Sequence, residues 1–131
     1  MNDLLFDTNV LIHAFRNNKY IASKLEKLRV ITIPSVVVGE LYQGSYNKRE
    51  LSTIESYINE YCEVIYANER VSSRALELMK KYTLSHNLLI IDALIAATAY
   101  EHSMTLVTED VSHFGGISEI DMWSLQQFVT E

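Results

Sequence analysis

Four acidic residues of this sequence stand where acids are rare, and together they could bind a cation. Asp7 ends the apolar stretch LLFD, and Asp110 closely follows the stretch TLVT. Glu40 and Asp92 lie inside VVVGEL and LLIIDALIAA, which contain no Lys or Arg. A lone ionised carboxylate in apolar surroundings costs several kcal/mol unless it is paired or coordinated. Convergence of the four carboxylates on a divalent cation would remove this cost for all of them.

Each acid also has a simpler explanation, and both interpretations stay open at this point. Asp7 and Asp110 could cap helices, since each stands where a strand is followed by a helix. Asp92 could cap a helix that begins at Ala93, and Glu40 could lie at the exposed edge of an amphipathic helix. These explanations are independent of one another, whereas a cation site accounts for all four acids at once.

The residue types favour a hard cation. Carboxylate oxygens select Mg²⁺ or Mn²⁺, while a single cysteine, Cys62, and scattered histidines disfavour zinc. Thr8, Asn9 and Thr108 stand near the acids and supply neutral oxygens and an amide. Such a site points to phosphoryl chemistry, in which a metal-activated water attacks and no protein nucleophile is required. The sequence has no G-x-x-x-x-G-K-[ST] loop, so we expect no nucleotide cofactor.

Short apolar strands alternate with helices along the chain. The pattern predicts strands at 4–7, 30–33, 63–67, 105–108 and 120–123. It predicts helices at 9–17, 21–28, 36–45, 48–61, 69–85 and 90–103, a short turn or helix near 110–114 and a C-terminal helix, with Ser35 and Asn68 as caps. Near-continuous apolar strands between helices indicate an α/β fold with a parallel sheet covered on both faces. Ligands of such sheets bind beyond the carboxyl ends of the strands, where the strand order switches.

Length and charge set further bounds. At 131 residues we expect one domain, spanning 1–131. The net charge of −6 argues against loose electrostatic binding to nucleic acid. All 11 Lys and Arg lie at or before Lys81, so the later part of the chain is acidic. We find no leader peptide or membrane span, and with a single cysteine we expect a cytoplasmic protein.

At these residues the sequence resembles PIN-domain ribonucleases, and most closely the VapC-type toxins of toxin–antitoxin pairs. The resemblance rests on LLFDTNVLIHAF, IPSVVVGELYQG and IIDALIAATAYEHSMTLVTEDVSHF, in this order along nearly the whole chain. It implies a three-layer α/β/α sandwich with a central five-stranded parallel sheet. It also implies an endoribonuclease that depends on Mg²⁺ or Mn²⁺ and cuts transfer or ribosomal RNA.

The resemblance also assigns roles to residues and names partners. Asp7, Glu40 and Asp92 match the acidic triad that holds the metal, and Asp110 matches a fourth acidic position. Thr8, Asn9 and Thr108 match polar residues that order the site. The resemblance further implies a homodimer and a cognate antitoxin that inserts a segment across the active-site groove.

Substrate contacts are the least defined part of the interpretation. Residues after Glu40 could stack on bases or contact phosphates, namely Tyr42, Gln43, Tyr46, Lys48 and Arg49. Alternatively, Tyr42 and Tyr46, four residues apart on one helical face, pack in the core or in a dimer interface, and we favour this interpretation.

The chain departs from its relatives at two positions. Glu109 stands where Arg is common, which removes a positive charge from the expected RNA path, and His113 stands where Asp is common. We interpret His113 as a surface residue in a turn and His13 as an exposed or partly packed helix residue.

Two other function classes stay open. The first is a PIN-like module that binds RNA or protein with little catalysis. The second is an aspartate-dependent phosphatase with Asp7 as nucleophile. Such enzymes need a second Asp, but this chain has Asn9 at that position. They also need a Lys near the late acids, but this chain has none after Lys81.

Overall fold

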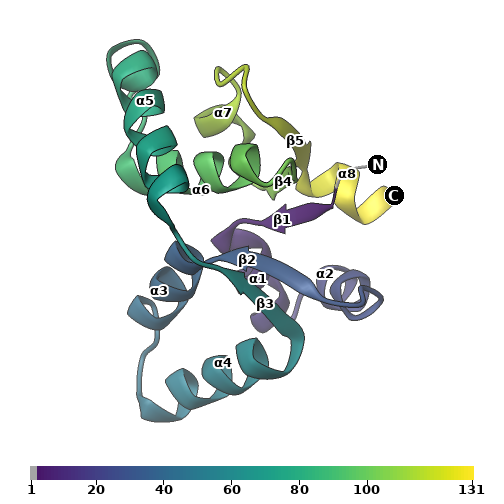
Figure 1. Ribbon diagram of the computed structural model, residues 1–131. Coiled ribbons are helices and arrows are strands. Elements are labelled where there is room, and N and C mark those ends of the chain that lie inside the picture. Colours follow the sequence, from purple (N-terminus) through teal and green to yellow (C-terminus); the bar gives the residue numbers. More distant parts are fainter. Residues whose placement is uncertain (1–2) are drawn as a thin grey trace.

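Five parallel strands form the centre of the molecule (Figure 1). The structure is a computed structural model that describes residues 3–131. The strands are β1 (Leu4–Phe6), β2 (Ile31–Pro34), β3 (Cys62–Ile65), β4 (Thr105–Thr108) and β5 (Asp121–Ser124). They lie side by side in the order β3-β2-β1-β4-β5, and every neighbouring pair is parallel. The predicted five-stranded parallel sheet is confirmed.

The strand order reverses between β1 and β4, at the middle of the sheet. The chain runs outward from β1 through β2 to β3 and then returns to β4 on the other side of β1. Phe6 lies opposite Val107, and the amide of Asp7 donates to the carbonyl of Val107 over 3.0 Å. The carboxyl ends of β1 and β4 therefore meet at the switch point, where ligands of open α/β sheets bind.

Helices cover both faces of this sheet. On one side lie α1 (Thr8–Phe15), α2 (Lys19–Glu26), α3 (Ser35–Gln43) and α4 (Lys48–Tyr61). On the other lie α5 (Glu69–His86), α6 (Ile90–Glu101) and α7 (Val111–Phe114), while the last helix, α8 (Leu125–Thr130), contacts α2. Figure 1 shows α5, α6 and α7 above the strands and α3 and α4 below them. The predicted three-layer α/β/α sandwich is confirmed.

The apolar pattern of each helix matches its place in these layers. In α5 the buried residues recur every three to four positions, at Val71, Ala75, Leu78 and Tyr82, so one face packs inward. In α6 the run from Ile95 to Ala99 is entirely buried, because this helix lies under α5 and contacts β4. No helix within residues 3–131 is long and apolar enough to cross a membrane.

Several helix ends differ from the sequence prediction. Pro34 holds the N-cap position of α3 in an extended conformation, so Ser35 is the first helical residue and not the cap. The same helix ends at Gln43, and Tyr42 and Tyr46 therefore do not share one helical face. Helix α6 begins at Ile90, as predicted, which places Asp92 in its first turn and excludes the alternative in which Asp92 caps a helix from Ala93. Asn68 caps α5 as predicted, accepting from the amide of Val71.

Candidate active site

Asp7 lies at the switch point with both carboxylate oxygens engaged. Its Oδ1 accepts from the amide of Thr8 over 2.7 Å, and its Oδ2 accepts from the hydroxyl of Thr108 over 2.7 Å. Asp7 is therefore the N-cap of α1, as the simpler interpretation of the sequence proposed. It is also 7% exposed, and burial raises the pKa of its carboxyl group above the ordinary value. Neighbouring Glu40 and Asp92 raise that pKa further.

A hydrogen-bond network joins the loop after β4 to the start of α1. The amide of Asp110 donates to the Thr108 hydroxyl over 2.9 Å, so Thr108 connects Asp7 with Asp110. The amide nitrogen of Asn9 donates to Asp110 Oδ2, and its oxygen accepts from the backbone of Glu109, each over 3.1 Å. Asp110 occupies the N-cap position of α7 but makes no capping hydrogen bond through its side chain.

Glu40 and Asp92 reach this network from helices on opposite faces of the sheet. Glu40 stands in the second turn of α3 and accepts from the hydroxyl of Thr8 over 2.5 Å. Asp92 stands in the first turn of α6, where partial burial raises the pKa of its carboxyl group. Glu40 and Asp110 also raise that pKa, whereas His113 lowers it. These influences, with the hydrogen bonds that join Asp7, Thr108 and Asp110, place the four acids around one end of the sheet.

The chemistry of this donor set suits a hard divalent cation. All of its donors are oxygens, and no Lys or Arg of the described chain contributes to the pKa shifts of Asp7 or Asp92. Within residues 3–131, however, no three His, Cys, Asp or Glu side chains are gathered closely enough to ligate one ion as they stand. Three of the carboxylates instead accept hydrogen bonds from protein side chains: Asp7 from Thr108, Glu40 from Thr8 and Asp110 from Asn9.

The PIN domain family matches residues 4–115, which include all four acids and the strands that carry them. This chain belongs to the PIN domain family. No curated protein matches it at a significant level. The predicted resemblance to PIN domains is thus confirmed over most of the sequence.

Solved structures similar to this PIN domain include several toxin–antitoxin complexes. DNA-bound VapBC from Salmonella typhimurium is 20% identical with a TM-score of 0.82, covering 95% of this chain and 98% of that chain. VapBC2 from Rickettsia felis, bound to a promoter DNA fragment, is 25% identical with a TM-score of 0.78, covering 92% and 97%. VapBC-1 from nontypeable Haemophilus influenzae is 22% identical with a TM-score of 0.78, covering 98% of both chains. The predicted resemblance to VapC-type proteins is confirmed at the level of fold.

Two histidines of this PIN domain lie closer to the acids than their sequence context indicated. His13 on α1 contacts Glu109 through Nε2 and Oε2 over 2.6 Å, at 37% and 48% side-chain exposure. The unusual Glu109 is therefore paired with an imidazole. His113 is exposed on α7, as predicted, but lies near enough to Asp92 to lower the pKa of that residue. The sequence held no signal for either contact, because the partners are far apart along the chain.

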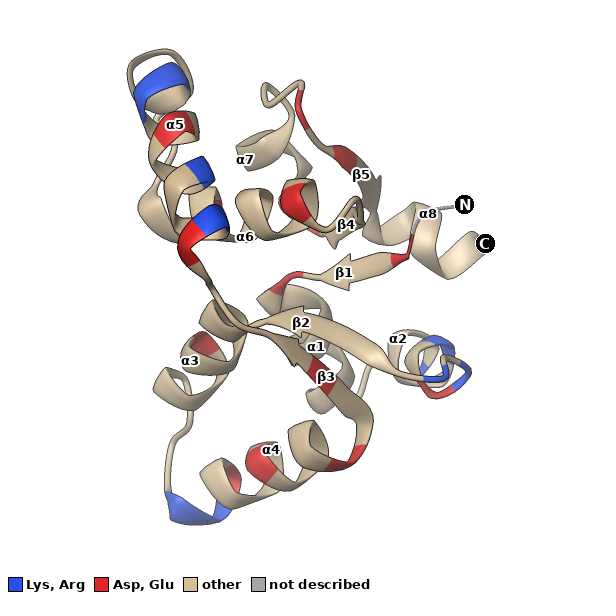
Figure 2. Ribbon diagram, in the orientation of Figure 1, with Lys and Arg blue, Asp and Glu red and all other residues tan. Residues whose placement is uncertain are grey.

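The predicted substrate residues fall into two groups. Tyr42 packs partly buried against the core, so the packing interpretation holds for it. Tyr46 is 80% exposed in the loop between α3 and α4, and Gln43 at the end of α3 and Lys48 and Arg49 at the start of α4 are also exposed. Figure 2 shows that Lys and Arg occur on α2, the start of α4 and α5, and are absent from α6, α7 and α8.

Proposed function

We propose that this PIN domain is a metal-dependent endoribonuclease, the toxin of a toxin–antitoxin pair, with Mg²⁺ as its cofactor and Mn²⁺ as a possible substitute. The observation that carries the proposal is the position of Asp7. A buried carboxylate with a raised pKa, beside Glu40 and Asp92, lies at the switch point of a parallel sheet. Carboxylates gathered in this way disfavour one another's ionised form, and a bound cation would remove that cost.

Asp7, Glu40, Asp92 and Asp110 are the residues that would hold one or two ions. A divalent cation at this position supplies charge neutralisation for a phosphodiester and lowers the pKa of an attacking water. Thr108 and the amide of Thr8 keep Asp7 in one orientation, while Asn9 holds Asp110. Thr8, Asn9 and Thr108 are thus proposed as positioning residues.

His113 and the His13–Glu109 pair flank the acids. His113 brings an imidazole to the side of Asp92, where the phosphate group of an RNA would pass. The imidazole of His13 holds the Glu109 carboxylate beside α1 through their 2.6 Å contact.

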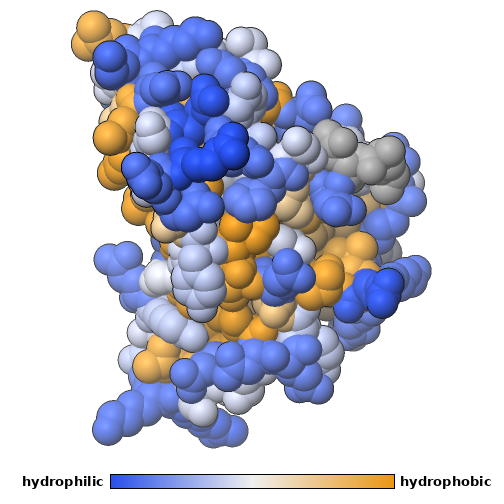
Figure 3. All heavy atoms as spheres, in the orientation of Figure 1, coloured by the Kyte–Doolittle hydropathy of each residue, from blue (hydrophilic) through white to orange (hydrophobic). Residues whose placement is uncertain are grey.

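Three partners belong to the proposal: an RNA substrate, a cognate antitoxin and a second copy of the chain, all met in the cytoplasm. The antitoxin is supported by the structural neighbours, which are complexes of toxin and antitoxin. The homodimer is supported by apolar side chains exposed on α5 and at the start of α6, including Leu76, Leu84, Leu89 and Ile90. Figure 3 shows apolar atoms at the surface along this side of the molecule.

The test compares the wild-type chain with Asp7→Asn on total transfer and ribosomal RNA, with Mg²⁺ and with a chelator. We expect cleavage by the wild type only when Mg²⁺ is present, and a loss of at least about a hundredfold in the variant, because a metal ligand is removed. Asp3→Asn is the matched control, since Asp3 is exposed and directly precedes β1.

A readout independent of cleavage is the melting temperature with and without Mg²⁺. Binding to the folded state alone raises stability, so Mg²⁺ should stabilise the wild type and Asp3→Asn but not Asp7→Asn. Full cleavage by Asp7→Asn would refute the site. Binding of RNA or of a protein partner without cleavage would instead favour the alternative of a PIN-like binding module.

A further inference from the structure

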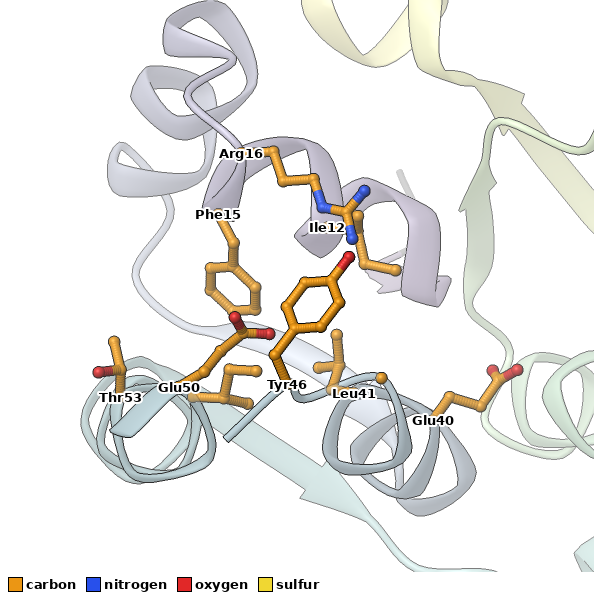
Figure 4. A pocket seen from close by; sticks show the side chains of 10 residues that line it. Ile12, Phe15, Arg16, Glu40, Leu41, Tyr46, Glu50 and Thr53 are labelled. Carbon is orange, nitrogen blue, oxygen red and sulfur yellow. The ribbon is translucent and has the colours of Figure 1, made fainter. Parts of the chain in front are cut away.

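A pocket of about 260 Å³ opens beside the candidate active site, between α1, α3 and α4. Its lining includes Phe15 at the end of α1 and Arg16 directly after it, Tyr46 from the loop after α3, and Glu50 from the first turn of α4 (Figure 4). Glu40 lines the same pocket and also accepts from Thr8 beside Asp7. The pocket and the acidic cluster therefore share one residue, and a ligand could occupy both.

Two opposite charges of this pocket have no partner within the described chain. Neither the guanidinium of Arg16 nor the carboxylate of Glu50 makes a hydrogen bond or ion pair with any residue of 3–131. In contrast, Arg74 is bound to Glu101 and Glu77 on the other face of the sheet. Arg16 and Glu50 are therefore both available to a ligand, one as a donor and the other as an acceptor.

An aromatic ring lies between these two charges. In Figure 4 the ring of Tyr46 stands between the Glu50 carboxylate and the Arg16 guanidinium, with its hydroxyl pointing toward Arg16. Tyr46 is 80% exposed, so one side of its ring is open to solvent. Phe15 lines the same pocket and is held edge-on against Tyr57, with ring centroids 5.0 Å apart. An exposed ring at the mouth of a pocket is a platform on which an unpaired base stacks.

We propose that this pocket binds a guanine base of the RNA whose phosphate lies at the acidic cluster. The inference rests on the proposed nuclease function. A base stacked on Tyr46 presents one edge to Glu50 and the other to Arg16. Guanine offers two adjacent donors, N1–H and N2–H, which a single carboxylate accepts together, and its O6 and N7 accept from an Arg. Adenine, cytosine and uracil lack that pair of adjacent donors.

The dimensions of the pocket agree with a single base. A volume of about 260 Å³ is below the roughly 300–1,000 Å³ of pockets for drug-sized ligands. Because Glu40 belongs to both the pocket and the acidic cluster, the bound guanine lies next to the cleaved phosphodiester in the RNA strand. The pocket thus reads the nucleotide at the cut and gives the nuclease a base preference.

The experiment sequences the RNA ends produced from a single-stranded library with random bases at every position. We expect the wild type to cut next to guanine, and Glu50→Gln to lose this preference by roughly tenfold to a hundredfold, since a bidentate pair to a base is removed. Glu55→Gln is the matched control, because Glu55 is exposed on the same helix and does not line the pocket. It should cut as the wild type does.

A second measurement does not depend on cleavage. NMR spectra of the wild type are recorded during titration with guanosine 5′-monophosphate and with adenosine 5′-monophosphate. Shifts at Arg16, Tyr46 and Glu50 with the guanine nucleotide alone would support the pocket, and Glu50→Gln should abolish them. Equal shifts with both nucleotides, or none with either, would overturn it.

The outcomes separate this inference from the function on which it rests. Cleavage without any base preference, or with a preference that survives Glu50→Gln, refutes the guanine pocket and leaves the nuclease standing. Absence of Mg²⁺-dependent cleavage in every variant refutes the nuclease. If Glu50→Gln weakens only the binding of a protein partner, the pocket is occupied by a protein segment and the inference fails.

Discussion

Replacing Thr108 by Val isolates the hydrogen bonds that hold the acidic cluster together. Val has nearly the shape of Thr but no hydroxyl, and Thr108 is fully buried. The change removes a donor to the Asp7 carboxylate and an acceptor for the Asp110 amide. Hydrogen bonds to charged groups contribute about 1.5–3 kcal/mol and neutral ones about 0.5–1.5 kcal/mol, so the expected loss is roughly 2–4.5 kcal/mol. For a chain of this size that lowers the melting temperature by roughly 6–20 °C.

The loss should depend on pH, because the Thr108 hydroxyl stabilises the ionised form of Asp7. Its hydrogen bond lowers the pKa of Asp7, against burial, which raises it. The stability difference between wild type and variant is therefore fully present above the raised pKa of Asp7. It declines as the pH falls through that pKa, since protonated Asp7 needs the donor less.

The assay is urea denaturation with a chelator present, at pH 7.5 and at about pH 4, near the ordinary pKa of Asp. Thr105→Val is the matched control, because Thr105 is buried on the same strand and its hydroxyl has no hydrogen-bond partner within residues 3–131. We expect that change to cost less than about 1 kcal/mol. An equal loss for the two variants, or a loss at position 108 that is the same at both pH values, would refute the reasoning.

Changes at three other positions have equally defined outcomes. Asp7→Asn should raise the stability of the metal-free protein at neutral pH, since the wild type loses stability as the pH rises through the raised pKa of Asp7. Thermal melts across pH 4–8 measure this effect. A variant that is less stable than the wild type at every pH would contradict it. Gly39→Ala on α3 should stabilise the protein by about 1 kcal/mol through helix propensity, because an added Cβ meets nothing within 4 Å; chemical denaturation measures it, and destabilisation would show a contact that the structure lacks. Glu101 is held by Arg70 and Arg74 at 3.1 and 3.0 Å, and its pKa is lowered. Glu101→Gln should therefore destabilise the protein at pH 7, and this effect should disappear as the pH falls through the pKa of Glu101. A destabilisation that persists in denaturation at about pH 3 would exclude the ion pairs as its cause.

The sequence was sufficient for the sheet because each strand is a short apolar run whose character does not depend on distant residues. The run Leu4–Phe6 and the run Thr105–Thr108 are both recognisable in isolation. The sequence predicted the helix starts less accurately than the strands. Pro34 ends β2 in an extended conformation and holds the cap position itself, which displaced the predicted cap at Ser35 by one residue.

What the sequence could not supply is the set of contacts between distant segments. Four acids in apolar surroundings indicated a cation site, but not that Asp7 would accept from Thr108 or that Glu40 would accept from Thr8. The pairing of His13 with Glu109 joins residues 96 positions apart and depends on strand order, which apolar periodicity does not reveal. Nothing in the sequence indicated that Arg16 and Glu50 line one pocket, because Arg16 follows the first helix and Glu50 lies in the first turn of a helix more than 30 residues later.

The hydrogen bond between Thr108 and Asp7 has a consequence for the synthesis of the chain, because it joins residues 101 positions apart. A ribosome adding about 5–20 residues per second needs roughly 5–20 s to pass from the first of these residues to the second. During that interval β1 lacks its neighbour β4, and Asp7 lacks the side chain that orients it. A growing or truncated chain that ends before β4 therefore lacks the contact that orients Asp7, and the candidate site forms only after Thr108 has been made.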